Sequence, residues 1–125
     1  MNHVATFDPD PFLRALDGDH ATFLEFGRQF LAMLPGSLAS LYEAAAAGDA
    51  GALREHAHAL KGSVAIFHAH PLLEELEAIE RTCRMAPGEI NAEATRALDQ
   101  ASDAFRREFD HYCNAIATGD ATQPN

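Results

Sequence analysis

The chain has 125 residues, which is the length of one domain and leaves no room for a second sizeable core. Alanine accounts for 25 of them, against two valines and four isoleucines, and this excess of a helix former over β-branched residues predicts an all-α domain. Nineteen acidic and nine basic side chains give a formal net charge of −10, which argues against nucleic acid and membrane surfaces as partners because both are anionic.

Proline and glycine divide the first part of the chain into two expected helices. After a loose lead-in of residues 1–8, the prolines at positions 9 and 11 start a short helix that runs to Leu16. A glycine then breaks the chain, and Asp19 is a good N-cap for a second helix. Pro35-Gly36 is expected to interrupt or kink that helix before it continues to Gly48. Its apolar stripe consists of Phe23, Phe26, Phe30, Leu34, Leu38, Leu41, Tyr42 and Ala45.

Three more amphipathic helices follow. Asp49 caps the first, Pro71 stands in the first turn of the second, and a loop at residues 86–88 precedes the third. Their stripes in chain order are Leu53, Ala57, Leu60, Val64 and Phe67, then Leu72, Leu73, Leu76, Ile79 and Cys83, then Ala94, Leu98, Ala101, Phe105, Phe109 and Tyr112. We therefore expect an up-down bundle of four main helices plus a short N-terminal helix, as one domain over residues 1–118, with a flexible tail over residues 119–125.

Residues 56–65 carry the pattern that points to chemistry. On a helical wheel centred on Leu53, His58 falls about 140° from the core direction and Gly62 about 180°, so both face solvent. Lys61, the only lysine of the chain, lies on the flank beside the imidazole. Glycine within a helix costs about 1 kcal/mol relative to alanine, so its use here indicates that something needs the space or the close approach of another backbone.

An exposed histidine beside a glycine and a lone lysine favours docking of a phosphoryl donor. A neutral imidazole is a nucleophile at cytoplasmic pH, and it can attack an acyl phosphate and hold the phosphoryl group as a phosphoramidate. The phosphoryl group brings up to about two negative charges, which the ammonium group of Lys61 would stabilise. The sequence has no glycine-rich phosphate loop, so it does not support nucleotide binding.

The run from His58 to Ser63, His-Ala-Leu-Lys-Gly-Ser, resembles the H-x-L-K-G-S signature of histidine phosphotransfer (HPt) domains, the carriers of multistep two-component phosphorelays. The resemblance covers roughly residues 10–113 and includes the helix ahead of the histidine helix and the turn at residues 48–49. The family's later L-x-x-x-C-x-x-L-E pattern is matched by Leu72, Leu76, Ile79 and Glu80, with Leu76 where the family often has cysteine.

This resemblance implies a four-helix bundle that presents an exposed phosphoacceptor, His58, to the aspartyl phosphate of a receiver domain. It implies that Lys61 stabilises the phosphate and that Gly62 gives the receiver room to approach. Mg²⁺ then belongs to the receiver, and this chain needs no cofactor or metal of its own. The protein would be a phosphocarrier and not an ATP-dependent kinase, with response-regulator receivers and a hybrid sensor kinase as partners. The docking face is expected to include Arg54, Gly62, Ala65 and Ile66.

The chain departs from the family pattern at His68, where the family usually has glycine. On the wheel this position lies near 60°, at the edge of the core, so the substitution puts the packing against the next helix in question. It leaves the chemistry of His58 untouched.

Two other functions compete with this one. The pairs His56/His58 and His68/His70 would favour a metal site, but side chains two residues apart on a helix point about 200° apart, so neither pair chelates through one face. A bundle that docks on a receiver or kinase and inhibits it without phosphotransfer is the alternative. The two cysteines lack metal-type spacing, and with no signal peptide they predict reduced thiols in a cytoplasmic protein.

Overall fold

Helices make up the regular structure of this protein. The structure is a computed structural model that describes residues 5–119, and no strand occurs in that range. The helices are α1 (Asp10–Ala15), α2 (His20–Ala46), α3 (Ala50–Ile66), α4 (His70–Met85) and α5 (Arg96–Thr118), with two short 3-10 helices, η1 (Pro87–Glu89) and η2 (Ala92–Thr95), ahead of α5. The predicted all-α bundle of four main helices and a short N-terminal one is confirmed.

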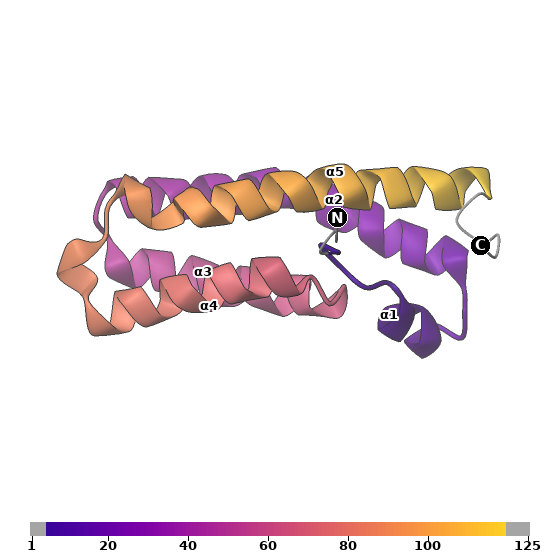
Figure 1. Ribbon diagram of the computed structural model, residues 1–125, viewed down its shortest axis with the longest axis horizontal. Coiled ribbons are helices and arrows are strands. Elements are labelled where there is room, and N and C mark those ends of the chain that lie inside the picture. The colour runs from indigo at the N-terminus through magenta and orange to yellow at the C-terminus, as the bar shows by residue number, and fades with distance from the viewer. Residues whose placement is uncertain (1–4, 120–125) are drawn as a thin grey trace.

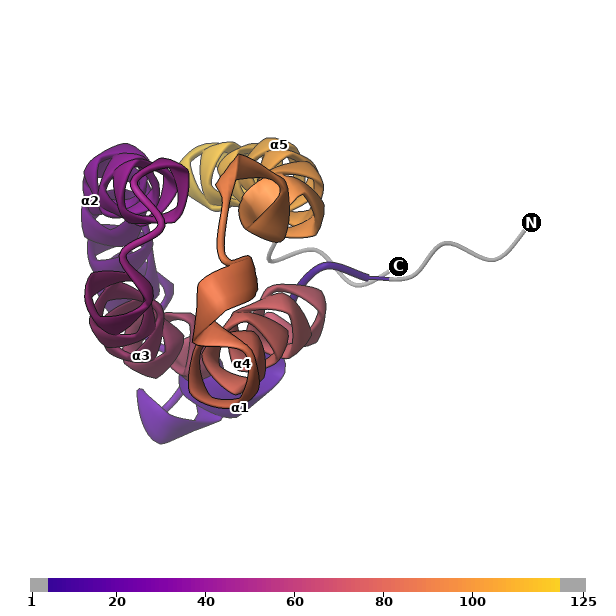
Figure 2. The ribbon, with the colours of Figure 1, turned by 90° about the vertical axis from the view of Figure 1, so that its left-hand side faces the viewer.

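The four long helices pack around a shared core. In Figure 1 α2 and α5 form one pair and α3 and α4 the other, and the end-on view of Figure 2 places them at four corners in the order α2, α5, α4, α3. Each of these helices contacts both of its neighbours, and α1 packs against α2. A corner helix such as α3 therefore turns one face to the core, two flanks to its neighbours and the remaining face to solvent.

Local side-chain and backbone signals set the ends of the helices. The Asp19 carboxylate accepts a hydrogen bond from the backbone N–H of Thr22 at 3.1 Å, and the Asp49 carboxylate accepts one from Ala52 at 3.0 Å. Both are N-caps that satisfy a free N–H at the start of a helix. Gly48 has φ of 70°, a left-handed conformation that glycine adopts freely, and it follows the end of α2. The predicted turn at residues 48–49 thus connects α2 to α3.

Pro35 does not interrupt α2, which continues as one helix of 27 residues from His20 to Ala46. The predicted interruption is therefore wrong, and a kink at Pro35 stays a prediction. Proline lacks the N–H that would bond the carbonyl of Leu31, but Pro35 itself is exposed, so water can satisfy that carbonyl. The buried side chains of Leu34 and Leu38, next to this position in the sequence, hold both halves of the helix against the core.

Phenylalanine rings form much of the core, but Phe26 is not among the buried ones. The predicted stripe of α2 is buried at Phe23, Phe30 and Leu34, whereas Phe26 is 46% exposed. Its ring contacts that of Phe12 in α1, with centroids 5.7 Å apart. Phe26 was predicted for the core because its spacing fits the stripe; it instead lies at the edge, where α1 covers only part of it.

The lead-in before α1 is packed where the structure describes it. Thr6 is buried and its hydroxyl donates a hydrogen bond to Glu108 Oε1 at 2.8 Å. The ring of Phe7 packs edge-on against Phe105, Phe109 and Tyr112 of α5. The expectation of a loose lead-in is therefore wrong for these residues, because one threonine and one aromatic ring find partners on α5. Residues 1–4 lie outside the described range.

The connection from α4 to α5 is more structured than predicted. Pro87–Glu89, in the expected loop, forms η1, and Ile90 behind it is buried. Ala94 was predicted in the last helix but belongs to η2, because α5 begins only at Arg96. Of the predicted tail, Gly119 is described as the left-handed cap of α5, and residues 120–125 lie outside the described range. Among the described residues, no helix is long and apolar enough to cross a membrane.

His68 lies just beyond the end of α3 and not on its core flank. The helix ends at Ile66, and the His68 N–H donates to the carbonyl of Ala65 at 3.1 Å. Its φ of 50° is left-handed, a conformation that costs an L side chain energy but costs glycine little. The wheel angle predicted for His68 is thus wrong, because the position no longer belongs to the helix. The requirement that favours glycine here is a backbone requirement, and α3 and α4 still pack closely.

Candidate functional site

The predicted orientation of α3 is confirmed by burial. The stripe of Leu53, Ala57, Leu60 and Val64 faces the core. The side chain of His58 is 75% exposed on the opposite side, and that of Lys61 is 28% exposed on the flank towards α4. The other sequence-predicted site residues also lie on the open side of α3 and are exposed: Arg54, Gly62, Ala65 and Ile66.

Glu80 of α4 connects His58 to Lys61. One carboxylate oxygen, Oε2, lies 3.1 Å from Nδ1 of His58, and the other, Oε1, lies 2.7 Å from Nζ of Lys61. The Glu80 side chain is only 13% exposed, so this contact is sheltered at the seam between α3 and α4. Sequence reasoning noted Glu80 as part of a family pattern but gave it no role. Because α3 and α4 are consecutive antiparallel helices, aligning their two sequences could have placed Glu80 opposite His58.

The charge of Glu80 follows from its partners. Burial raises the pKa of its carboxyl group, but hydrogen bonds from Lys61 and His58 outweigh burial and hold that pKa below its ordinary value. The carboxylate is therefore ionised at neutral pH and can only accept a hydrogen bond. It accepts from N–H at Nδ1 of His58, so the neutral ring keeps its lone pair on Nε2.

An open hollow lies beside His58 between α3 and α4, with a volume of about 470 Å³. The small residues Gly51 and Ala59 leave room in it. Its walls carry ionisable side chains, one of which is the acceptor candidate: Arg54, Glu55, His58 and Glu80.

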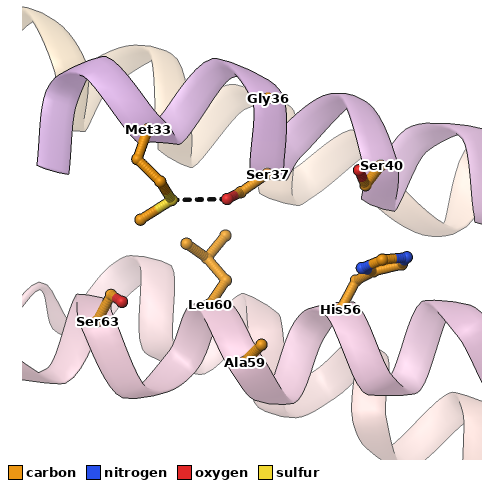
Figure 3. A pocket seen from close by; sticks show the side chains of 8 residues that line it. All are labelled: Met33, Gly36, Ser37, Ser40, His56, Ala59, Leu60 and Ser63. Atoms are coloured by element: carbon orange, nitrogen blue, oxygen red, sulfur yellow. Dashed lines mark hydrogen bonds between the residues drawn. The ribbon is translucent and has the colours of Figure 1, made fainter.

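A second hollow runs along the other flank of α3, against α2. Figure 3 shows side chains from both helices turned into it, among them Met33 and Ser37 from α2 and Leu60 from α3. Its volume is about 490 Å³, and the Ser37 hydroxyl donates to the sulfur of Met33 at 2.7 Å. The lining is mostly small: Met33, Gly36, Ser37, Ser40, His56, Ala59, Leu60 and Ser63.

Exposed apolar side chains lie next to this second hollow. Phe26 and Ile66 are each 46% exposed and Met33 is 39% exposed, and all three line a smaller adjoining hollow of about 270 Å³. We call these three residues the apolar edge. Sequence reasoning found Ile66 but missed Phe26, which it assigned to the core, and Met33. The distance along the chain between α2 and α3 hid their proximity.

Packing within the described chain does not require a glycine at position 62. A Cβ atom built on it would meet no heavy atom within 4 Å, whereas one built on Gly27 would lie 3.1 Å from Sγ of Cys113. Gly27 is thus required by the core, and Gly62 is not. Its cost to the helix is consistent with a requirement from outside the chain.

The pairs His56/His58 and His68/His70 do not form a metal site with other side chains of the described residues. The rings of His68 and His70 lie with centroids 5.7 Å apart. Within residues 5–119, no three His, Cys, Asp or Glu side chains are placed so that they could hold a metal ion.

Comparison with known proteins gave one family. The family model for the Hpt domain matches residues 25–108, which is more than half of the chain. Neither the comparison with curated proteins nor that with solved structures gave a match.

Proposed function

The chain belongs to the Hpt domain family, whose members transfer phosphoryl groups through a histidine in phosphorelays, and we propose that His58 is the residue that carries the phosphoryl group here. The observation that carries this proposal is the bridge made by Glu80, which joins Nδ1 of His58 to the ammonium group of Lys61. This bridge leaves Nε2 as the nucleophilic atom on a side chain that is 75% exposed.

The reaction follows from this placement of protons. Nε2 of His58 attacks the phosphorus of an aspartyl phosphate in a receiver domain. The new N–P bond forms as the P–O bond to the aspartate breaks, and the electron pair of that bond leaves with the aspartate carboxylate. The imidazole ring gains positive charge during attack, and the ionised Glu80 opposite Nδ1 stabilises it. The same steps in reverse pass the group to another receiver.

Lys61 would stabilise the charge that arrives. A phosphoryl group carries about two negative charges near neutral pH. The four-carbon stem of lysine is flexible, so the ammonium group can turn from Glu80 to a phosphoryl oxygen on Nε2 while remaining near both. Mg²⁺ and the other half of the reaction centre belong to the receiver, and no cofactor is assigned to this chain.

The docking face would centre on the open side of α3. Arg54, Gly62, Ala65 and Ile66 lie there around His58. We extend the face to α2 through the apolar edge, because Phe26 and Met33 adjoin Ile66 around one hollow. The proposed partners are receiver domains of response regulators and a hybrid sensor kinase, which places the protein in the cytoplasm.

The test follows a label from a receiver to this protein. A receiver carrying a radiolabelled aspartyl phosphate is mixed with the wild type, with His58→Gln and with His56→Gln, whose exposed histidine lies two residues away on the same helix. We expect label on the wild type and on His56→Gln, and none on His58→Gln. Equal labelling of His58→Gln would contradict the assignment. Binding of the receiver without any transfer would favour the alternative, a bundle that docks on a receiver or kinase and inhibits it.

A further inference from the structure

The hollow beside His58 contains one cation whose hydrogen-bond donors are unused. Arg54 and His58 both line this space of about 470 Å³, and Arg54 lies one helical turn before His58 on α3. Lys61, nearly one turn after His58, is bound to Glu80 at 2.7 Å. Arg54 has no ion pair or side-chain hydrogen bond within residues 5–119. Arg54 and Lys61 thus lie on opposite sides of His58 along the helix, and of these two cations only Lys61 is already held by a carboxylate.

The position of Arg54 places its charge towards α4, where Glu80 holds the imidazole. Burial raises the pKa of the Cys83 thiol in α4, and Arg54 acts in the opposite direction while Glu80 adds to the rise. Arg54 and Glu80 are therefore both near Cys83. Glu55 also lines the hollow and carries negative charge, whereas the charge of Glu80 is matched by Lys61.

An anion with several oxygens fits this setting best. The guanidinium group presents five N–H donors in a flat fork that matches the oxygens of a phosphate, and it keeps its charge at all ordinary pH values. Gly51 and Ala59 leave the space next to the ring open. His58 lines this space, and a phosphoryl group on its ring would bring more negative charge there than Glu55 contributes.

We propose that this hollow is an oxyanion subsite for the phosphohistidine, in which Arg54 donates hydrogen bonds to the phosphoryl oxygens on Nε2 of His58. The inference rests on the proposed function, because it requires His58 to be the acceptor. It assigns Arg54 a part in holding the transferred group in addition to contact with a receiver. Removal of Arg54 should therefore destabilise the phosphorylated protein even when no receiver is present.

The experiment needs no partner protein. Potassium phosphoramidate phosphorylates the protein, since its P–N bond breaks and ammonia leaves as the bond to Nε2 forms. Phosphorus NMR then follows the decay of the phosphohistidine at neutral pH and the pH titration of its phosphoryl group. We expect Arg54→Gln to shorten the half-life by about threefold to tenfold, the usual effect of one partly exposed charged hydrogen bond, and to raise the pKa of the phosphoryl group.

Two further variants separate binding from general charge. Arg107→Gln removes the same charge from α5, where Arg107 pairs with Asp103 at 3.0 Å, and should leave both the half-life and the titration unchanged. Arg54→Lys keeps the positive charge but lacks the planar guanidinium group. It should therefore restore the wild-type pKa of the phosphoryl group but only part of the wild-type phosphohistidine half-life. Wild-type decay and titration in Arg54→Gln, with label on His58, would overturn the subsite and leave the proposed function intact. Failure to label His58 in any variant, whether by phosphoramidate or by a receiver, would overturn both.

Discussion

Glu80 shows how one sheltered carboxylate can fix the orientation of an exposed histidine ring. A histidine that is 75% exposed would ordinarily rotate freely, and its proton would exchange between the two ring nitrogens. The Glu80 carboxylate restricts both the ring rotation and the exchange of the proton, because it accepts a hydrogen bond from the N–H at Nδ1 and is itself held by Lys61. Surface ion pairs contribute little to stability, so the effect of this bridge is felt at the site, where it orients the ring, more than in the fold.

The backbone at His68 supplies a prediction at the scale of one residue. Its φ of 50° is one that glycine adopts without strain, and the family usually has glycine there. We expect His68→Gly to raise the free energy of unfolding by about 1 kcal/mol, measured by urea denaturation with far-UV circular dichroism. The reverse control is Gly48→Ala, where φ is 70° and the new Cβ would lie 3.5 Å from the carbonyl oxygen of Ile90.

Gly48→Ala should lower the free energy of unfolding by about 1 kcal/mol for the same reason that His68→Gly raises it. If His68→Gly leaves stability unchanged or reduces it, then contacts of the imidazole, such as that with His70, outweigh the backbone strain. In that case the departure from the family pattern would be stabilising.

At the scale of an element, the exposed Gly62 of α3 supplies a prediction for both stability and docking. A Cβ atom at position 62 would meet no heavy atom within 4 Å, so Gly62→Gln should add about 0.5 kcal/mol to the free energy of unfolding through better helix propensity. The same side chain should block receiver-dependent labelling of His58 by occupying the docking face. The two effects are measured on one protein by urea denaturation and by label transfer.

Gly88→Gln is the matched control for Gly62→Gln. Gly88 is also exposed with open space around its Cβ position, but it lies in η1 and not on α3. Label transfer to Gly88→Gln should match that to the wild type. Normal transfer to Gly62→Gln would show that the docking face lies elsewhere, whatever the stability of that variant.

The elements differ in how far their sequence predicted them. Helix starts at Asp19 and Asp49 were predictable because an N-cap acts within a few residues. The exposure of Phe26 was not, because periodicity identifies an apolar stripe but not how wide a strip the neighbouring helices cover. For the site, His58 and Lys61 follow from spacing along one helix. Glu80 could be found only by aligning two antiparallel helices, and the hollow at Arg54 depends on side-chain volumes that no local pattern encodes.

For the whole molecule, the distribution of charge over the surface affects the approach of a receiver more than the net charge does. The net charge of −10 would repel the aspartyl phosphate of an approaching receiver at long range. The single lysine and Arg54 both lie beside His58, so the open side of α3 is the place where that repulsion is locally offset. Such an arrangement favours one docking orientation over the others, because within about 10 Å unscreened local charges dominate.

Acid stability should report the Glu80 bridge in the folding of the whole molecule. The folded pKa of Glu80 is held below its ordinary value of 4.5 by Lys61 and His58. A carboxyl group with a lowered folded pKa contributes stability that is fully present above the ordinary pKa and is lost as the pH falls through the folded value. Glu80→Gln should therefore be less stable than the wild type by about 0.5 to 1 kcal/mol at neutral pH. The two proteins should converge as the pH falls from the ordinary pKa of the carboxyl group through its lowered folded pKa.

Urea denaturation followed by far-UV circular dichroism at a series of pH values measures this convergence. Glu77→Gln, an exposed change on the same helix, removes one carboxylate without touching the bridge and should run parallel to the wild type across the series. A constant gap between Glu80→Gln and the wild type from neutral to acid pH would mean that the glutamine disturbs packing at the seam of α3 and α4. A gap that closes below the ordinary pKa identifies the ion pair as the source, because only the charged carboxylate loses its advantage there.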